Sequence, residues 1–274
     1  MRTSPSRGDV VRAALHQVVT FADHVFHGNP AYVAVFDGQP RHPMMEEVCK
    51  VVGADVLAVI ENPADARPRL SFFTDTGPHP GAGHATQAAA HVALNWNGRA
   101  RTSVSFLLPD GAAREARRGD HGVAVEWPLM SYASTDQAEA IAAAIGRKPL
   151  TCLDSAFGYI AILADGHDVA SLTPDLARIT TFERTAMIVT APAKGPDVVI
   201  RVFAPRVGLP EDPVCGTAHR IIIPYWAERL GKSVIHSRHL SPRGGDLWCQ
   251  ARGNSVTIAG PTVTSFEATL FLPT

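Results

Sequence analysis

The chain has 274 residues, of which 46% are hydrophobic and 19% charged, a composition typical of a globular protein. Its formal net charge of −1 gives no electrostatic basis for binding nucleic acid or an anionic membrane. No apolar run reaches the roughly 20 residues of a membrane helix, and the start of the chain shows no export signal. We therefore expect a cytoplasmic protein without nucleic-acid or membrane partners, large enough for one or two hydrophobic cores.

The cysteines show no metal-binding or disulfide pattern. They form no Cys-x-x-Cys pair and have no zinc-ligand spacing with histidine. A core of this size needs no disulfide, so we expect neither a metal site nor a disulfide from Cys49, Cys152, Cys215 and Cys249.

The first part of the chain predicts strands and one short helix. After a polar start that we expect to be disordered over about the first 13 residues, strands are predicted at 15–20, 32–36 and 56–60, with a helix at 44–52. Asp55 lies at the junction between that helix and the third strand. It is either a turn or cap residue or a carboxylate in a water-poor position, which is costly unless the group is paired or protonated.

A glycine-bearing loop then leads from a strand into a helix. Residues 69–74 alternate as a strand, 75–80 contain Gly77, Pro78 and Pro80, and a helix is predicted at 84–96. The free N–H groups of such a helix start favour an anion, and His84 can exchange a proton near neutral pH. The alternative is that His84 is only a capping or surface residue.

The middle of the chain predicts further short elements. Strands at 102–108 and 123–127 flank Arg114, Arg117 and Arg118, which we interpret as a solvated hairpin turn. Helices are predicted at 136–145 and 174–178, and strands at 159–163, 169–172 and 186–190.

The strand–loop–helix design is then repeated. A strand at 198–203 and a proline-bearing loop at 204–213 lead into a helix from Cys215-Gly216-Thr217 to about residue 231, which Pro224 is expected to bend or shorten. Strands follow at 233–239, 246–252, 255–259 and 266–271. The two helix starts, at Gly83 and Gly216, lie almost half the chain length apart, which indicates an internal duplication.

Both repeated helices are apolar on nearly every side but too short for a membrane, so each belongs in a core. We expect an α+β fold of two pseudo-repeated domains, each a curved β-sheet or barrel wrapped around a central helix. The domains are predicted at residues 1–127 plus 262–274 and at 128–261.

Several motifs resemble the PhzF family of phenazine-biosynthesis isomerase-like proteins. They follow in the family's order over nearly the whole chain after about residue 14: Gly28-Asn29-Pro30, Gly81-Ala82-Gly83-His84-Ala85-Thr86, Glu211-Asp212-Pro213-Val214-Cys215-Gly216-Thr217-Ala218-His219, Pro224-Tyr225-Trp226 and Ser241-Pro242-Arg243-Gly244-Gly245. The resemblance implies a diaminopimelate epimerase-like fold, an active site in the cleft between domains, no metal or organic cofactor, and a homodimer.

The resemblance also implies roles for single residues. Asp55 takes the place of the family's acid/base carboxylate, which is usually Glu preceded by Ser, whereas here Ala54 precedes it. His84 matches the active-site histidine and Asp212 the second carboxylate. The substrate-binding positions match Gly83, Gly216 and Thr217, and Ala54 and Cys215 are also expected to bind the substrate.

The implied reaction is a proton shift that moves a double bond in a small cyclic unsaturated carboxylic acid. The shorter Asp55 favours a proline-derived cyclic imine acid in antibiotic metabolism over a phenazine precursor. Two alternatives stay open: an amino-acid racemase or epimerase that uses Cys215 as a base, and a small-ligand-binding protein without catalysis. Asp212 as a turn residue and Cys215 as a small apolar core residue are the non-functional interpretations.

Overall fold

The computed structural model describes residues 10–273, and its contacts divide the chain into two compact units. Of the described residues, unit 1 comprises 10–20, 30–118 and 262–273, and unit 2 comprises 21–29 and 119–261. The sequence-based boundary lies at residue 127. The contacts place the change at residue 118 because strand β8 (Gly122–Pro128) pairs along its length with β16 (Ser255–Gly260), which belongs to unit 2.

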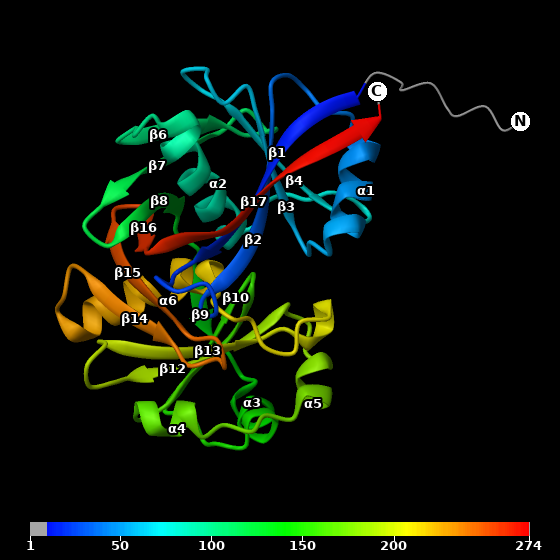
Figure 1. Ribbon diagram of the computed structural model, residues 1–274. Coiled ribbons are helices and arrows are strands. Elements are labelled where there is room, and N and C mark those ends of the chain that lie inside the picture. Colours follow the sequence, from blue (N-terminus) through cyan, green and yellow to red (C-terminus); the bar gives the residue numbers. More distant parts are fainter. Residues whose placement is uncertain (1–9, 274) are drawn as a thin grey trace, which may run out of the picture. The chain divides into compact units, whose positions relative to one another are not determined.

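Unit 1 is built of strands around helix α2 (Figure 1). Its helices are α1 (His42–Val52), α2 (Gly83–Asn95) and the short 3-10 turn η1 (Trp96–Gly98). Its strands are β1 (Val10–Thr20), β2 (Asn29–Phe36), β3 (Leu57–Glu61), β4 (Arg69–Thr74), β5 (Gly77–Pro78), β6 (Ser103–Leu107), β7 (Ala113–Gly119) and β17 (Thr262–Pro273). β1 and β17 form a long antiparallel pair with a bulge between Gln17 and Val18.

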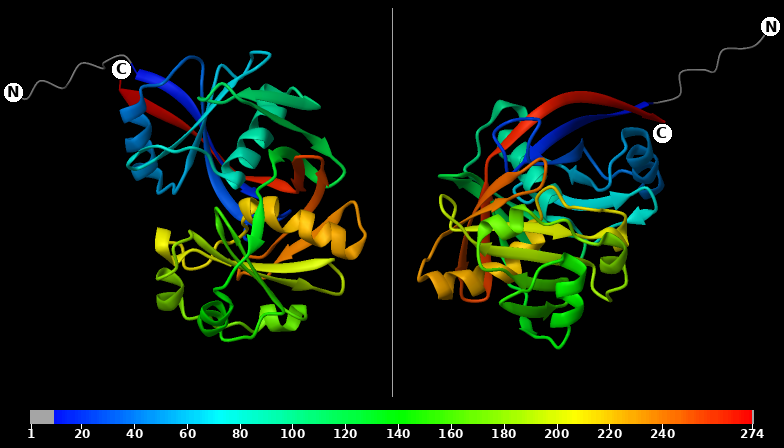
Figure 2. Two further views of the ribbon diagram at one scale, coloured as in Figure 1. Left: turned by 180° about the vertical axis from the view of Figure 1, so that it is seen from behind. Right: turned by 90° about the horizontal axis from the view of Figure 1, so that it is seen from below.

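Unit 2 is built in the same way around helix α6 (Figure 2). Its helices are α3 (Ala138–Ile145), α4 (Gly166–Ala170), α5 (Leu176–Thr180), the 3-10 turn η2 (Pro205–Val207) and α6 (Gly216–Leu230). Its strands, besides β8 and β16, are β9 (Tyr132–Ser134), β10 (Thr151–Ser155), β11 (Gly158–Ile162), β12 (Ala186–Pro192), β13 (Val198–Phe203), β14 (Ile235–His239) and β15 (Gly245–Arg252).

The order of strand pairing confirms the expected internal repeat. In unit 1, β2 runs parallel to β3, β3 antiparallel to β4, β4 parallel to β6 and β6 antiparallel to β7. In unit 2, the same alternation runs through β11, β12, β13, β14 and β15. The central helix follows the third strand of the series in both units, as α2 after β4 and α6 after β13. The α+β class with a central helix in each half is therefore confirmed.

The central helices owe their position to small and apolar side chains. In α2 the alanines at 85, 88, 89, 90 and 93 are almost fully buried, so β1, β3 and β6 approach the helix closely. In α6 the buried residues include Ile221, Ile222 and Ile223, which pack in a core with side chains of the surrounding strands. Among residues 10–273 no helix has both the length and the apolar character needed to span a membrane.

The helix α6 passes through Pro224, so of the two expected effects, a bend or a shortened helix, the shortening was wrong. A proline has no N–H, and the carbonyl of Arg220 one turn earlier would lack its helical partner. The backbone N–H of Met130 donates to that carbonyl at 3.1 Å instead. The missing hydrogen bond is thus replaced from a distant part of the chain.

Three other local predictions were wrong. The Arg114 to Arg118 segment lies on strand β7, an amphipathic strand whose only buried side chain is that of Ala116, and the turn comes after it. Residues 169–172 were expected as a strand, but Val169 is the buried residue of the short helix α4. Residues 10–13, expected to be disordered, belong to β1, and the remainder of that expected segment lies outside the described residues.

Candidate active site

The start of α2 in unit 1 carries Gly83 and His84 in its first turn. Its N-cap residue, Ala82, makes no side-chain cap hydrogen bond, and the first N–H groups of a helix have no helical partner. Burial first, and then repulsion by His79, lower the pKa of His84 to about 4. His79 is itself fixed, because its Nδ1 accepts the N–H of Gly81 at 3.1 Å. At neutral pH His84 is therefore an uncharged imidazole beside an anion-attracting helix terminus.

Asp55 lies elsewhere in unit 1, in the bend between α1 and β3. Gly53 ends α1 in the left-handed conformation, and the N–H of the buried Ala54 donates to the Cys49 carbonyl at 3.0 Å. This turn directs Asp55 outward, and its side chain is exposed, which agrees with the turn interpretation and not with a water-poor position. Its place as the family's acid/base position stays a prediction.

The start of α6 in unit 2 carries the second carboxylate. Asp212 is half-buried, and its Oδ1 accepts two hydrogen bonds at 3.1 Å, one from Asn29 Nδ2 and one from the N–H of Val214. The Cys215 thiol is a further hydrogen-bond partner of this carboxyl group. Gly216 and Thr217 open the helix directly after Cys215, the N-cap residue, whose side chain makes no cap hydrogen bond by distance and angle.

Burial dominates the protonation of Asp212. It raises the pKa of the carboxyl group from its ordinary 3.8 to about 6, even though Cys215 and the Val214 N–H favour the ionised form, and repulsion by Glu211 adds to the rise. A carboxyl group with this pKa is present in both protonation states near neutrality, which a group that accepts and returns a proton requires.

The same surroundings disfavour Cys215 as a base. Burial, followed by the charge of Asp212, raises the pKa of the thiol well above its ordinary range, although the N–H groups of Ala218 and Thr217 oppose the shift. A thiolate is the reactive form of cysteine, so this side chain stays protonated and packs in the core around α6.

Two buried histidines hold the backbone of Cys215. His219 Nδ1 lies 2.8 Å from the Cys215 carbonyl, and its Nε2 lies 2.9 Å from Ser237 Oγ. Because a carbonyl only accepts, His219 carries its proton on Nδ1 and accepts from Ser237. The N–H of Cys215 donates to His239 Nε2 at 3.2 Å, and burial keeps both histidines uncharged by lowering their pKa values.

The structure thus brings Asp212, Cys215, Gly216 and Thr217 together at one helix start, and Gly83 with His84 at the other. Sequence reasoning gave no role to Asn29 or His239, which contact Asp212 and Cys215. Asn29 belongs to the motif Gly28-Asn29-Pro30, so the sequence indicated its position but not its contact with Asp212. His239 carried no sequence signal, because a histidine inside a strand is unremarkable.

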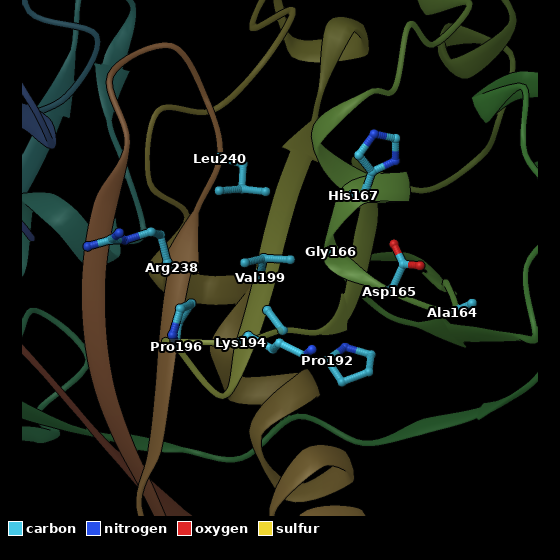
Figure 3. Close-up of a pocket in the computed structure, with 11 residues that line it drawn as sticks. Ala164, Asp165, Gly166, His167, Pro192, Lys194, Pro196, Val199, Arg238 and Leu240 are labelled. Atoms are coloured by element: carbon cyan, nitrogen blue, oxygen red, sulfur yellow. The ribbon is translucent and has the colours of Figure 1, made fainter.

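A separate pocket of about 640 Å³ in unit 2 contains none of the predicted residues (Figure 3). Two of its charged side chains already have other contacts: Asp165 caps α4 by accepting the N–H of Asp168, and Arg238 binds Asp246. Within residues 10–273, Asp165, His167 and Asp168 form the one group close enough to share a cation, and all three lie at or near the surface. We assign no metal to it.

Known proteins share both sequence and fold with this chain. The family model described as "Phenazine biosynthesis-like protein" matches residues 18–268. An "uncharacterized isomerase" of Pseudomonas aeruginosa is 33% identical over 248 residues, which cover 90% of this chain and 94% of that protein.

Solved structures agree with that match. A PhzF-family protein of Enterococcus faecalis superimposes with a TM-score of 0.89 at 28% identity, covering 95% of this chain and all of the other. A hydroxyproline epimerase of Agrobacterium vitis, with bound trans-4-hydroxy-L-proline, shares the fold with a TM-score of 0.58 at 13% identity, covering 96% and 93% of the two chains. The chain belongs to the phenazine biosynthesis-like (PhzF) family.

Proposed function

We propose that this protein is an isomerase that moves a double bond in a small cyclic unsaturated carboxylic acid by a proton shift. The observation that carries the proposal is Asp212, a half-buried carboxyl group with a pKa of about 6 at the start of a central helix. The name of the Pseudomonas aeruginosa relative, an isomerase, is consistent with it.

The reaction needs a base, an acid and a site for the substrate carboxylate. A base removes a proton from one ring carbon, the electron pair delocalises through the double bond toward the carboxylate, and a proton returns to another carbon. Because the same number of protons leaves and returns, no redox partner is required. We assign the proton transfers to Asp212 and Asp55.

The helix starts supply the binding groups in this proposal. The first N–H groups of α6, at Gly216 and Thr217, bind a substrate carboxylate, an interaction of roughly 0.3–1 kcal/mol at an exposed helix terminus and more when it is desolvated. Gly83 and His84 bind a second polar group. With a pKa of about 4, His84 acts as an uncharged hydrogen-bond partner.

Within the proposal the substrate is a proline-derived cyclic imine acid of antibiotic metabolism, and the protein is a homodimer that uses no cofactor. The racemase alternative depends on a reactive Cys215, and the raised pKa of that thiol counts against it. Analytical ultracentrifugation of the full chain measures the oligomeric state independently of any substrate.

The test is deuterium incorporation from heavy water into a panel of cyclic unsaturated and imine carboxylic acids. We expect deuterium at a ring carbon with the wild type and at least a hundredfold slower incorporation with Asp212→Asn, the scale of a lost general acid/base. Incorporation that survives in Asp212→Asn but is lost in Asp55→Asn would move the essential proton to Asp55. Ligands that bind without any incorporation would contradict the isomerase and favour a binding protein.

A further inference from the structure

Two motifs that have no role in the proposed reaction lie around Asp212. They are Gly28-Asn29-Pro30, at the start of β2, and Ser241-Pro242-Arg243-Gly244-Gly245, between β14 and β15. Both contact residues 211–215, the segment that leads into α6. Their contacts show what they do to the carboxyl group.

The orientation of the Asn29 amide is determined by a backbone carbonyl. Its Nδ2 lies 3.0 Å from the Val214 carbonyl oxygen and 3.1 Å from Asp212 Oδ1. A carbonyl oxygen only accepts, so the amide must present its NH₂ group there, and the same NH₂ group donates to Asp212. Asn29 is only 7% exposed, so water does not compete readily for these bonds.

Oδ1 of Asp212 therefore receives two donors, Asn29 Nδ2 and the Val214 N–H. An oxygen whose lone pairs accept two N–H groups is a poor place for an acid proton. We propose that Asn29 is a positioning residue that keeps Asp212 Oδ1 as an acceptor and thereby directs the exchangeable proton of Asp212 to Oδ2. The inference rests on the proposed function, because that function gives this proton its catalytic use.

The 241–245 turn fixes Asn29 and the segment that it contacts. Gly28 donates to the Gly244 carbonyl at 2.9 Å, and Arg243 Nε donates to the Gly28 carbonyl at 2.7 Å. On the other side, Ser241 Oγ donates to the Pro213 carbonyl at 2.6 Å. One turn thus holds the residues directly before Asn29 and directly after Asp212, and sets the distance between the two side chains.

The groups next to Asp212 are ion-paired or buried. Glu211 is bound by Arg201 through two hydrogen bonds of 2.7 and 2.8 Å. The Cys215 thiol stays protonated, and His239, which accepts the Cys215 N–H, stays uncharged because burial lowers its pKa. A titration observed at Asp212 near this pH therefore reports on Asp212 itself.

The test is a carboxyl ¹³C NMR titration of the full chain with labelled aspartate, in which Asp212→Asn assigns the signal. We expect a midpoint near 6 in the wild type and a rise of about 1 pH unit or more in Asn29→Ala, because a donor to the ionised form is lost. Asn29→Asp keeps the side-chain volume but places two carboxyl groups together, so its upper midpoint should rise at least as far. Asn254→Ala, an exposed asparagine of the same unit, should leave the midpoint unchanged.

The Val214 amide ¹H chemical shift tests the choice of oxygen. If the proton enters at Oδ2, this amide keeps its bond to Oδ1, and its signal stays downfield below pH 5. An upfield move of this signal as Asp212 becomes protonated would overturn the assignment to Oδ2. If both Asn29 variants lowered the melting temperature but left the Asp212 midpoint unchanged, Asn29 would be only a structural residue. Neither readout needs a substrate, so a failed isomerase assay leaves both decisive.

Discussion

Replacing Asp212 by asparagine should stabilise the protein at neutral pH. In the folded state burial raises the pKa of this carboxyl group to about 6, so the ionised form is disfavoured there relative to the unfolded chain. Asparagine has nearly the same shape, and its side-chain oxygen can still accept from Asn29 and Val214. The substitution removes the cost of ionisation while keeping the contacts at Oδ1.

The sign follows from proton linkage. Between pH 3.8 and about 6 the folded wild type binds more protons at Asp212 than the unfolded chain, so its contribution to stability falls as pH rises through this window. At about 1.4 kcal/mol per pH unit the window corresponds to roughly 3 kcal/mol, and to somewhat less because the side chain keeps part of its water contact. The difference between Asp212→Asn and wild type should therefore be near zero at pH 4 and grow to about 2–3 kcal/mol at pH 7.

The assay is urea unfolding of both proteins at half-unit steps from pH 4 to pH 7.5. Asp154→Asn is the matched control: two hydrogen bonds of 2.7 Å from Arg184 lower the pKa of the Asp154 carboxyl group, so its replacement should destabilise, and more so above pH 4. A stability difference for Asp212→Asn that does not change with pH would refute the raised pKa and, with it, the main support for the proposed acid/base role.

Three further outcomes test the packing at Gly245, the role of Cys215 and the pKa of His84. Gly245→Ala should lower the free energy of unfolding by about 1–3 kcal/mol, because the added Cβ would lie 2.6 Å from Val214 Cγ2. The control Gly119→Ala, whose added Cβ would have no contact closer than 3.6 Å, should be neutral or slightly stabilising in the same urea assay. Cys215→Ala should keep deuterium incorporation within about tenfold of wild type, and a complete loss would restore the racemase-type base. The ring signals of His84 should titrate with a midpoint near 4 in a ¹⁵N–¹H NMR series, and a midpoint near 6.5 would show an imidazole that is not desolvated.

The repeated helix starts could be predicted because their signals are local. Glycines and prolines before an apolar stretch mark a loop that enters a buried helix, and the structure begins α2 at Gly83 and α6 at Gly216, close to the predicted residues. Strands β4 and β13 were likewise predicted with the bounds that the structure gives them. Alternation and β-branched or aromatic residues suffice for such strands.

The errors occur where a distant contact overrides a local rule. Pro224 is tolerated because Met130 donates to the Arg220 carbonyl, and nothing near Pro224 in the sequence shows that donor. Strand β7 was missed because three arginines hide the single buried residue, Ala116, and its pairing with β6 compensates for the weak pattern. Asp55, which the sequence left open as a turn residue or a water-poor carboxylate, is exposed because the left-handed turn at Gly53 directs it outward.

Asp212 shows why the candidate site could be found only from the sequence and the structure together. The resemblance marked the aspartate, but a carboxylate next to a proline in a loop has no unusual pKa by itself. Its pKa depends on burial by segments that are far apart in the sequence of unit 2. Asn29 comes from residues 21–29, and the turn at 241–245 holds it in place. The two donors at Oδ1 do not offset the effect of burial, so the pKa of Asp212 stays at about 6. Ionising the group at neutral pH therefore costs stability. More hydrogen bonds to the carboxylate would have lowered this pKa and removed the cost of ionisation. A carboxyl group that is retained for proton transfer should show such a cost.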